Sequence, residues 1–422
     1  MAPSLKAPRY LSQFRCLGEA CPDTCCAGFT VLLDSSDLAR VDSAIGSSRS
    51  LRARRQQAIH PEDDGEGAVA SLKQGEACSF LDADRLCSLI KRRGQAGVPD
   101  ACALYPRTLS YLADHVELRA TAGCPEIARS LVTDPDALVV GEVPADAAAR
   151  IPEPGPRPPP TAYSQRRDQV LRLGERVLDA PGPVRQRLAV LGRFSAAVEE
   201  TFHRGSPGVD PQAWSAASKR FLGRSAGAPA TRWLGQASES DRTLGAQILF
   251  SLLMNLRDGG SRRFTRLLDA SLATYHQALP TGSDEALFSA LASVFQQRDR
   301  ELQAKVGPSL EGALRRHLQN EWRRVWFTQS RSLSAHLFGL SLELAAVRIL
   351  LNAHPAALAL PAKRPSPEQE ADFTQALIDT LQIVSRRLGS THGLLETLEE
   401  QLSPQALGTD DAGRLRLLLT YC

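Results

Sequence analysis

The sequence predicts a mainly α-helical protein, in which a small cysteine-rich module with irregular and β-hairpin structure precedes a multi-helix domain. Three observations lead to this fold class. Eight of the nine cysteines lie in the first 124 residues, six prolines follow in residues 151–163, and apolar residues then recur every three or four positions. We therefore expect a cysteine-rich unit at 1–140, a proline-rich linker at 141–163 and a helical domain at 164–422.

Short strands and turns are expected in the front unit. The segment Phe29–Asp34 is apolar and β-branched, as in a strand. Apolar flanks around Asp82-Ala83-Asp84 indicate a tight turn, and the segment Arg107–Ala120 is typical of a hairpin that turns near Ala113-Asp114. A turn-rich module of this kind has little core of its own and often needs a metal to hold it together.

The proline run favours extended conformations and predicts a stiff spacer, and helices are expected beyond it. Apolar residues from Val184 to Phe202 make one stripe on a helix of about five turns. Another helix has Ser366 as N-cap and Pro367 in its first turn, with apolar residues up to Leu388. Further stripes lie at 248–256, 264–275, 287–295 and 314–325, with loops at 223–231 and 361–367.

Composition argues against several classes of function. The net charge of +3 over 422 residues does not indicate binding to nucleic acid. The N-terminus lacks an apolar signal region, and the most apolar segment, Ser332–Asn352, contains charged residues, which favours a buried helix over a membrane span. We expect a cytoplasmic protein that engages neither nucleic acid nor membrane, and in that compartment stable disulfides are rare.

The cysteine pattern predicts a metal centre. Four thiols lie within eleven residues and four more follow at wider spacing, namely Cys16, Cys21, Cys25, Cys26, Cys78, Cys87, Cys102 and Cys124. Thiolates select zinc, copper(I) or iron–sulfur clusters. Cys21 and Cys25 are spaced to reach one centre, whereas the adjacent Cys26 must point elsewhere or bend the backbone. Cys124 precedes a helix that starts at Pro125, and the positive end of that helix is expected to lower the pKa of its thiol.

Several common catalytic motifs are absent from the sequence. No G-x-G-x-x-G follows a strand, no G-x-S-x-G or Walker loop occurs, and no two histidines are spaced as in H-x3-H. A Rossmann-type methyltransferase, a hydrolase and a histidine metal site are therefore not indicated.

Four segments of the front unit resemble flagellin lysine N-methylases, which share this module with the Cys-rich iron/zinc-chelating family. They are Tyr10–Asp34, Cys78–Ile90, Pro99–Leu109 and Ala122–Leu131. In the helical part the similarity depends mainly on His317–Phe327 and the long apolar helix after it. The spacing C-x3-C-x2-C of radical enzymes is absent, because Cys26 follows Cys25 directly.

The resemblance implies S-adenosylmethionine-dependent methylation of lysine ε-amino groups on flagellin. It also implies a [4Fe-4S] cluster, with zinc as the alternative metal, and it makes all eight front cysteines ligand candidates without indicating which four share one centre. Cys422 matches no motif of the family and is left out.

Three further residues are candidates for the reaction. The lysine amine, with a pKa of about 10.4, must lose a proton before it accepts a methyl group. Glu126, close to the candidate ligand Cys124 in the sequence, is a candidate base, with helix capping as the alternative role. Arg107 is a candidate partner for the carboxylate of the methyl donor, or else forms a structural salt bridge. Tyr105 either lines the pocket or packs in the core.

The helical domain is expected to bind the protein substrate. The segment Glu321–Phe327 offers Trp322, Arg323, Arg324 and Trp326, types that are enriched in binding hot spots. The two tryptophans are four residues apart, so core packing is the alternative interpretation. Two other functions stay open for the whole chain. One is a non-catalytic zinc- or iron-binding protein with a helical interaction scaffold, and the other is a redox sensor built on Cys25 and Cys26.

Overall fold

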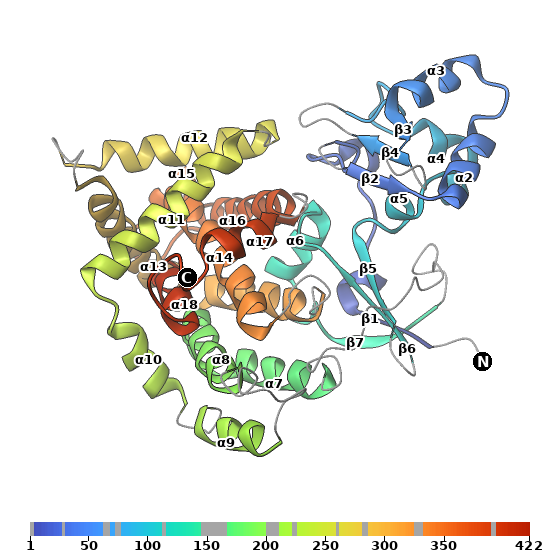
Figure 1. The fold of residues 1–422 in the computed structure, drawn as a ribbon. Helices are drawn as coiled ribbons and strands as arrows, with labels where there is room; N and C mark the ends of the chain where they lie inside the picture. The colour runs from blue at the N-terminus through green and yellow to red at the C-terminus, as the bar shows by residue number, and fades with distance from the viewer. Residues whose placement is uncertain are drawn as a thin grey trace.

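The chain is mainly helical, with two small sheets near its beginning, in agreement with the predicted fold class. The computed structural model describes residues 4–27, 30–61, 68–71, 77–111, 115–144, 167–199, 211–221, 226–258, 261–280, 286–324, 332–389 and 394–422. Figure 1 shows a large helical body and a smaller lobe beside it.

The larger sheet has the strand order β5-β6-β1-β7. Its strands are β5 (Arg107–Tyr111), β6 (His115–Ala120), β1 (Ser4–Pro8) and β7 (Val140–Val143). β5 and β6 are antiparallel, with Arg107 opposite Ala120, which confirms the predicted hairpin. β1 runs parallel to β6 and antiparallel to β7. Residues 141–143, placed in the linker from the sequence, are thus part of a strand, and residues 145–163 lie outside the described residues.

The smaller sheet has the order β2-β4-β3 and belongs to the lobe. The lobe contains β2 (Thr30–Leu33), β3 (Ile59–Pro61), β4 (Ala68–Ser71), α2 (Ser35–Ile45), α3 (Arg49–Ala58), α4 (Ser88–Arg93) and α5 (Asp100–Leu104). β2 confirms the predicted strand. The predicted turn is confirmed as well, because Asp82 N donates to Leu86 O at 2.9 Å and Arg85 adopts a positive φ of 62°.

The hydrophobic cores divide the front of the chain differently from the predicted boundary at residue 140. The lobe has a core of its own, which includes Leu33, Val41, Ile45, Phe80 and Leu89, so the expectation of a front unit with little core is wrong for this part. β1, β6 and α6 (Pro125–Thr133) share one core with the helical body instead. The apolar sides of these elements are covered by helices from the second half of the chain.

A buried hydrogen-bond chain joins these front elements to the helical body. Tyr10 Oη lies 2.6 Å from Asn320 Oδ1 and accepts a hydrogen bond from Ala120 N at 2.9 Å. Asn320 Nδ2 donates to Ala120 O at 2.8 Å. Buried polar groups that find partners in this way fix the register between segments far apart in sequence.

Helices make up most of the chain after residue 166. They are α7 (Arg167–Asp179), α8 (Val184–Glu199), α9 (Pro211–Phe221), α10 (Gly227–Gly235), α11 (Glu239–Arg257), α12 (Arg262–Gln277), α13 (Leu287–Arg324), α14 (Leu333–Asn352), α15 (Pro355–Leu358), α16 (Pro367–Gly389), α17 (Leu394–Gln401) and α18 (Asp411–Leu419). The predicted stripes fall in helices, although Phe202 and Val325 lie outside the described residues. The predicted capping at Ser366 is confirmed by Gln369 N donating to Ser366 Oγ.

The loop predicted at 223–231 is wrong from Gly227 onward, where α10 begins. Pro229 suggested an irregular segment, but it lies in the first turn of the helix. Backbone N–H groups there have no acceptor within the helix, so a proline removes no helical hydrogen bond. The loop at 361–366 is confirmed.

α14 is the buried helix expected from its composition. Among the described residues it alone has the length and hydropathy of a membrane span, yet 89% of its apolar window is buried inside the protein. A core helix of a globular domain has the same composition, and the charged side chains of α14 have partners in the surrounding helices.

A buried ion network spans the kink in α13. The backbone of Val306 is non-helical, and Pro308 follows it. Arg348 on α14 reaches both halves of the kinked helix: its Nη2 lies 2.6 Å from Asp299 Oδ1 and its Nη1 lies 3.2 Å from Glu311 Oε1. One guanidinium thus holds two carboxylates on either side of the kink.

A second buried ion pair joins α13 to α14. Nε2 of His317 lies 3.2 Å from Oε1 of Glu343, to which Ser385 Oγ also donates at 2.5 Å. Burial alone would lower the pKa of His317, but the charges of Glu343 and Glu321 and the hydrogen bond to Glu343 together outweigh burial, and the pKa is raised. Burial alone would raise the pKa of Glu343, but the charge of His317 and the hydrogen bonds to His317 and Ser385, with the charge of Arg324, together lower it. Glu321 and Arg324 also face His317 and act on its pKa in opposite directions.

We expect Glu343→Gln to make the fold sensitive to mild acid. In the wild type the raised pKa of His317 adds stability that is fully present below the unfolded histidine pKa of about 6.5 and is lost as pH rises through the folded value. In the variant, burial lowers that pKa instead. The unfolding temperature of the variant should therefore fall more steeply than that of the wild type between about pH 8 and about pH 5.5.

The control is Glu301→Gln, which changes an exposed carboxylate on α13, the helix that carries His317. Its unfolding temperature should follow that of the wild type at every pH. If Glu343→Gln shows the same pH profile as Glu301→Gln, the pair between His317 and Glu343 does not hold the charge assigned to it.

Candidate thiol site

All nine cysteines are free thiols. Seven of the eight in the front third form two neighbouring groups, and the eighth, Cys26, is the chain neighbour of Cys25. The four-thiol group consists of Cys25, Cys78, Cys87 and Cys102, each of which interacts electrostatically with the other three. Backbone contacts bring these segments together. Cys78 N donates to Cys26 O at 2.7 Å, and Cys87 pairs with Leu81 across the turn.

The lobe provides most of the four-thiol group. Cys87 is the N-cap of α4 and Cys102 lies on α5, while Cys78 and Cys87 pack against the core of the lobe. Cys25 comes from the segment that enters the lobe, and its thiol is hydrogen-bonded to that of Cys26. The thiols of Cys25 and Cys26 therefore interact with each other, and the other expected alternative, a bend of the backbone at Cys26, stays a prediction.

The three-thiol group consists of Cys16, Cys21 and Cys124, which also interact pairwise. Cys124 is buried in the core of the helical body and is the N-cap of α6. Cys21 donates through its sulfur to Asp23 O at 3.3 Å and also interacts with Cys25. The two thiol groups are therefore neighbours, one at the lobe and the other at the helical body.

The surroundings favour protonated thiols. Burial raises the pKa of Cys102 to about 12 and also raises those of Cys78 and Cys87. Burial likewise raises the pKa of Cys124 to about 12, although backbone N–H groups at the start of α6 act in the opposite direction. The expected lowering of the pKa of Cys124 is therefore wrong, because desolvation outweighs the helix end.

The thiols fit a soft metal in donor chemistry but not in arrangement. Sulfur is the donor that zinc and iron–sulfur clusters prefer. Among the residues that the structure describes, no three or more His, Cys, Asp or Glu side chains are placed around one point as metal ligands would be. The metal ligand set thus stays a prediction, now sorted into two groups of thiols.

Arg107 lies beside the three-thiol group. Its guanidinium stacks over Phe14 at 5.1 Å from the ring centroid, and its Nε is buried and has no hydrogen-bond partner among the residues that the structure describes. Burial lowers the pKa of Arg107, while the thiols of Cys124 and Cys16 act in the opposite direction. A partly desolvated guanidinium of this kind is a good partner for an anionic group.

Tyr105 and Glu126 are the other two candidates. Burial raises the pKa of Tyr105, and Arg386, Cys124 and Cys25 are among the groups that act on this pKa. Glu126 lies in the first turn of α6 and accepts a hydrogen bond from Arg129 Nε at 3.1 Å. This contact is an ion pair within the helix, and both roles expected for Glu126, helix capping and catalysis, stay predictions.

The predicted hot-spot segment is largely part of the core. Trp322 is fully buried, and its Nε1 donates to Leu171 O at 3.2 Å, so the core interpretation is confirmed for this residue. Arg323 pairs with Glu117 and Glu175, and Arg324 with Glu321. Trp326 lies outside the described residues.

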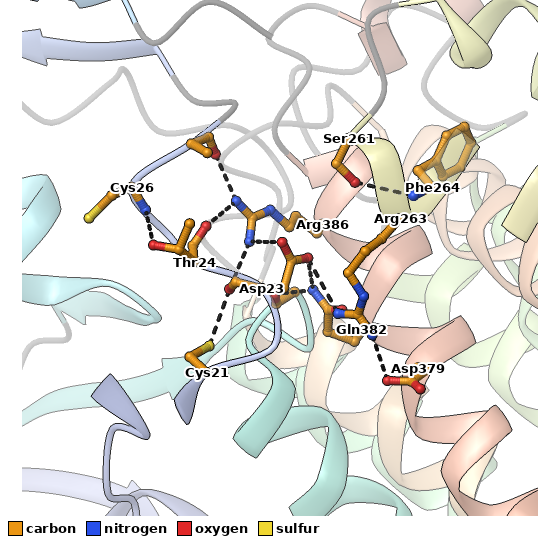
Figure 2. A network of polar contacts seen from close by, with 12 residues as sticks. Cys21, Asp23, Thr24, Cys26, Ser261, Arg263, Phe264, Asp379, Gln382 and Arg386 are labelled. Carbon is orange, nitrogen blue, oxygen red and sulfur yellow. Dashed lines mark hydrogen bonds and ion pairs between the residues drawn. The ribbon is translucent and has the colours of Figure 1, made fainter. Parts of the chain in front are cut away.

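Helix α16 supplies polar side chains to the thiol segments, which the sequence analysis missed. Figure 2 shows Arg386 and Gln382 directed at Asp23, between Cys21 and Cys26. The only local signal in the sequence is that these polar residues interrupt the apolar stripe of a helix.

Comparisons with known proteins point in the same direction as the thiol motifs. The chain is 27% identical over 136 residues to the flagellar biosynthetic protein FliU of Salmonella muenchen, which is 32% of this chain and 80% of that protein. It is 29% identical over 139 residues to a lysine-N-methylase of Salmonella choleraesuis and 28% identical over 138 residues to one of Salmonella typhimurium.

These matches cover only part of this chain and part of the relatives. Each covers 32% of this chain, and the two lysine-N-methylases are matched over only 34% of their own length. No family model and no solved structure matches the chain. Over about a third of its length, the chain is thus similar to proteins named lysine-N-methylase, in agreement with the family resemblance of its cysteine motifs.

Proposed function

We propose that this chain is a cytoplasmic protein-lysine N-methyltransferase that acts on flagellin, takes its methyl group from S-adenosylmethionine and uses an iron–sulfur cluster. The observation that carries the proposal is the similarity to lysine-N-methylases. It is supported by the name of the FliU relative, which refers to the flagellum, and by the gathering of seven front thiols in two neighbouring groups.

We assign the two groups of thiols to different tasks. The four-thiol group would hold a structural zinc ion, since tetrathiolate sites commonly bind zinc. The three-thiol group would hold the [4Fe-4S] cluster, which its sulfur donors fit in chemistry. When bound there, the cluster would supply an iron to which the amino and carboxylate groups of the methyl donor attach. Arg107, which lies beside this group, would pair with the carboxylate of the donor.

The remaining work falls to residues of the chain itself. The substrate lysine must be uncharged when its nitrogen forms the bond to the methyl carbon, and the proton it gives up needs an acceptor. Glu126, at the start of α6 beside Cys124, is the proposed acceptor, and as its side chain is one quarter exposed it can pass the proton to water. The largely buried Tyr105 would exclude water between the thiol groups.

A methyl-transfer assay tests the proposal directly. The anaerobically purified chain is incubated with labelled S-adenosylmethionine and flagellin, and we expect label on lysine side chains. Arg107→Gln should raise the KM for the donor about tenfold or more, because a charge-assisted contact is lost. Arg49→Gln, an exposed arginine of α3, is the control and should leave the KM unchanged. A protein that holds iron and sulfide yet transfers no label would contradict the methyltransferase assignment.

A non-catalytic metal-binding protein is the second candidate. The FliU relative, matched over 80% of its length, is named for flagellar biosynthesis and not for methylation. A colourless protein with stoichiometric zinc and no methyl transfer would favour this function. A protein that contains no metal after purification and forms a reversible disulfide between Cys25 and Cys26 would favour a redox sensor instead.

A further inference from the structure

Helix α16 contacts the thiol-bearing segment 21–27 through one arginine. The guanidinium of Arg386 donates hydrogen bonds to the carbonyl oxygens of Asp23, Thr24 and Ala27 at 3.1, 2.6 and 2.7 Å. It also lies 3.1 Å from Asp23 Oδ1. Figure 2 shows the guanidinium group surrounded by this segment. Arginine suits the task because its planar group carries five donors in fixed directions.

Two more side chains of the helical body hold the same carboxylate. Gln382 Nε2 donates to Asp23 Oδ2 at 2.9 Å and to Gly123 O at 2.9 Å. Arg263 Nη1 lies 3.7 Å from Asp23 Oδ2 and donates to Gln382 Oε1 at 2.9 Å (Figure 2). Gly123 directly precedes Cys124, so α16 binds the backbone of both segments that bring thiols to the helical body.

The backbone of α16 approaches the second segment closely. A Cβ atom at Gly123 would lie 3.1 Å from Cα of Arg386 and 3.3 Å from both its Cβ and its N. A side chain at Gly123 would therefore crowd the backbone of α16, and either segment would have to shift by a few tenths of an ångström.

The contacts of Arg386 are well protected from water. Its side chain is 8% exposed and that of Asp23 is 11% exposed. Charge-assisted hydrogen bonds are strongest where water is excluded. The positive charge also acts on Cys25 and Tyr105, so Arg386 lies near the sulfur of Cys25 in the four-thiol group.

We infer that Arg386 is a positioning residue, through which the helical body fixes the segment 21–27 and thereby the sulfur of Cys21. Any effect of Arg386 on metal binding rests on the proposed function, whereas its effect on the position of the Cys21 thiol does not. Cys78 and Cys87 pack against the core of the lobe and are not held in this way.

Thiol alkylation measures this positioning without any metal. The reduced full-length chain is treated with iodoacetamide in the presence of a chelator, and the rate at each cysteine is followed by mass spectrometry. Arg386→Gln should raise the rate at Cys21 about tenfold or more, because the segment opens locally. Arg386→Lys should recover part of the protection, since an ammonium group reaches fewer carbonyls. The rate at the buried Cys422 should stay low, which excludes global unfolding.

The next residue of α16 provides a matched control. Arg387 is also buried, but it donates to Leu256 O at 3.0 Å and not to the segment 21–27. Arg387→Gln should lower the unfolding temperature and leave the rate at Cys21 unchanged. A second variant, Asp23→Asn, leaves α16 intact and should expose Cys21 in the same way as Arg386→Gln.

Two results would overturn the inference. One is that Cys21 is alkylated at the same rate in Arg386→Gln and in Arg387→Gln. The other is that Arg386→Gln raises the alkylation rates of Cys21 and Cys422 alike, while Asp23→Asn leaves the rate at Cys21 unchanged. Iron content is measured on the same samples. A wild-type chain that takes up no iron contradicts the proposed cluster, whereas the alkylation rates decide the role of Arg386 independently.

Discussion

Replacing Cys25 by alanine is expected to abolish metal binding at the four-thiol group and to loosen the lobe. The physical reason is that structural metal sites contribute about 10–16 kcal/mol of binding free energy to folding, and removing one of four ligands forfeits most of it. Zinc and iron are measured in the anaerobically purified variant, and unfolding is followed by circular dichroism. The metal of the four-thiol group should fall to background, and the unfolding transition should broaden.

Cys422→Ala is the control for this change. Cys422 is almost fully buried, whereas Cys25 is exposed. Cys422 lies far from the front thiols in the sequence, and its sulfur donates to Ser341 O at 3.2 Å. We expect the same metal content as in the wild type and an intact lobe. If the variants at Cys25 and Cys422 behave alike, the assignment of the front thiols to a metal centre is incorrect.

Replacing Arg348 by methionine is expected to lower the free energy of unfolding by about 3–5 kcal/mol. The change keeps much of the side-chain volume but leaves Asp299 and Glu311 as buried carboxylates without their cation. The two halves of α13 would then lose the bridge across the kink. Urea unfolding at neutral pH measures the difference, and the midpoint should shift to lower concentration.

Arg300→Met separates this effect from a general loss of positive charge. Arg300 lies on α13 close to Asp299 in sequence, but its side chain is exposed. Surface substitutions of this type usually change stability by no more than about 0.5 kcal/mol. A loss of similar size in both variants would mean that the network around Arg348 contributes little to the fold.

The helical part of the fold was predictable from local pattern, and its polar contacts were not. The apolar stripes, the capping box at Ser366 and the buried character of α14 all follow from spacing along one helix. In the sequence, Arg348 lies 37 positions from Glu311 and 49 positions from Asp299, and no local pattern marks such partners. The start of α10 was missed because a proline there was interpreted as a loop residue.

The candidate site was predictable in its chemistry but not in its grouping. The cysteines, Arg107 and Tyr105 were found from residue type and motif, and the structure places them near one another. The division of the thiols depends on which core each segment joins, since Cys78 and Cys87 pack with the lobe and Cys124 with the helical body. The pKa of Cys124 was predicted with the wrong sign, because burial cannot be seen in a motif.

The sequence by itself determined that this is a mainly helical protein with a thiol-rich front third, because periodicity and cysteine spacing are properties of short segments. Only the tertiary structure decided that Arg386, more than 350 positions from Asp23, holds the thiol segment in place. The reason is physical. Hydrogen-bond partners of a buried guanidinium are selected by the packing of whole helices, which depends on every side chain of the core at once.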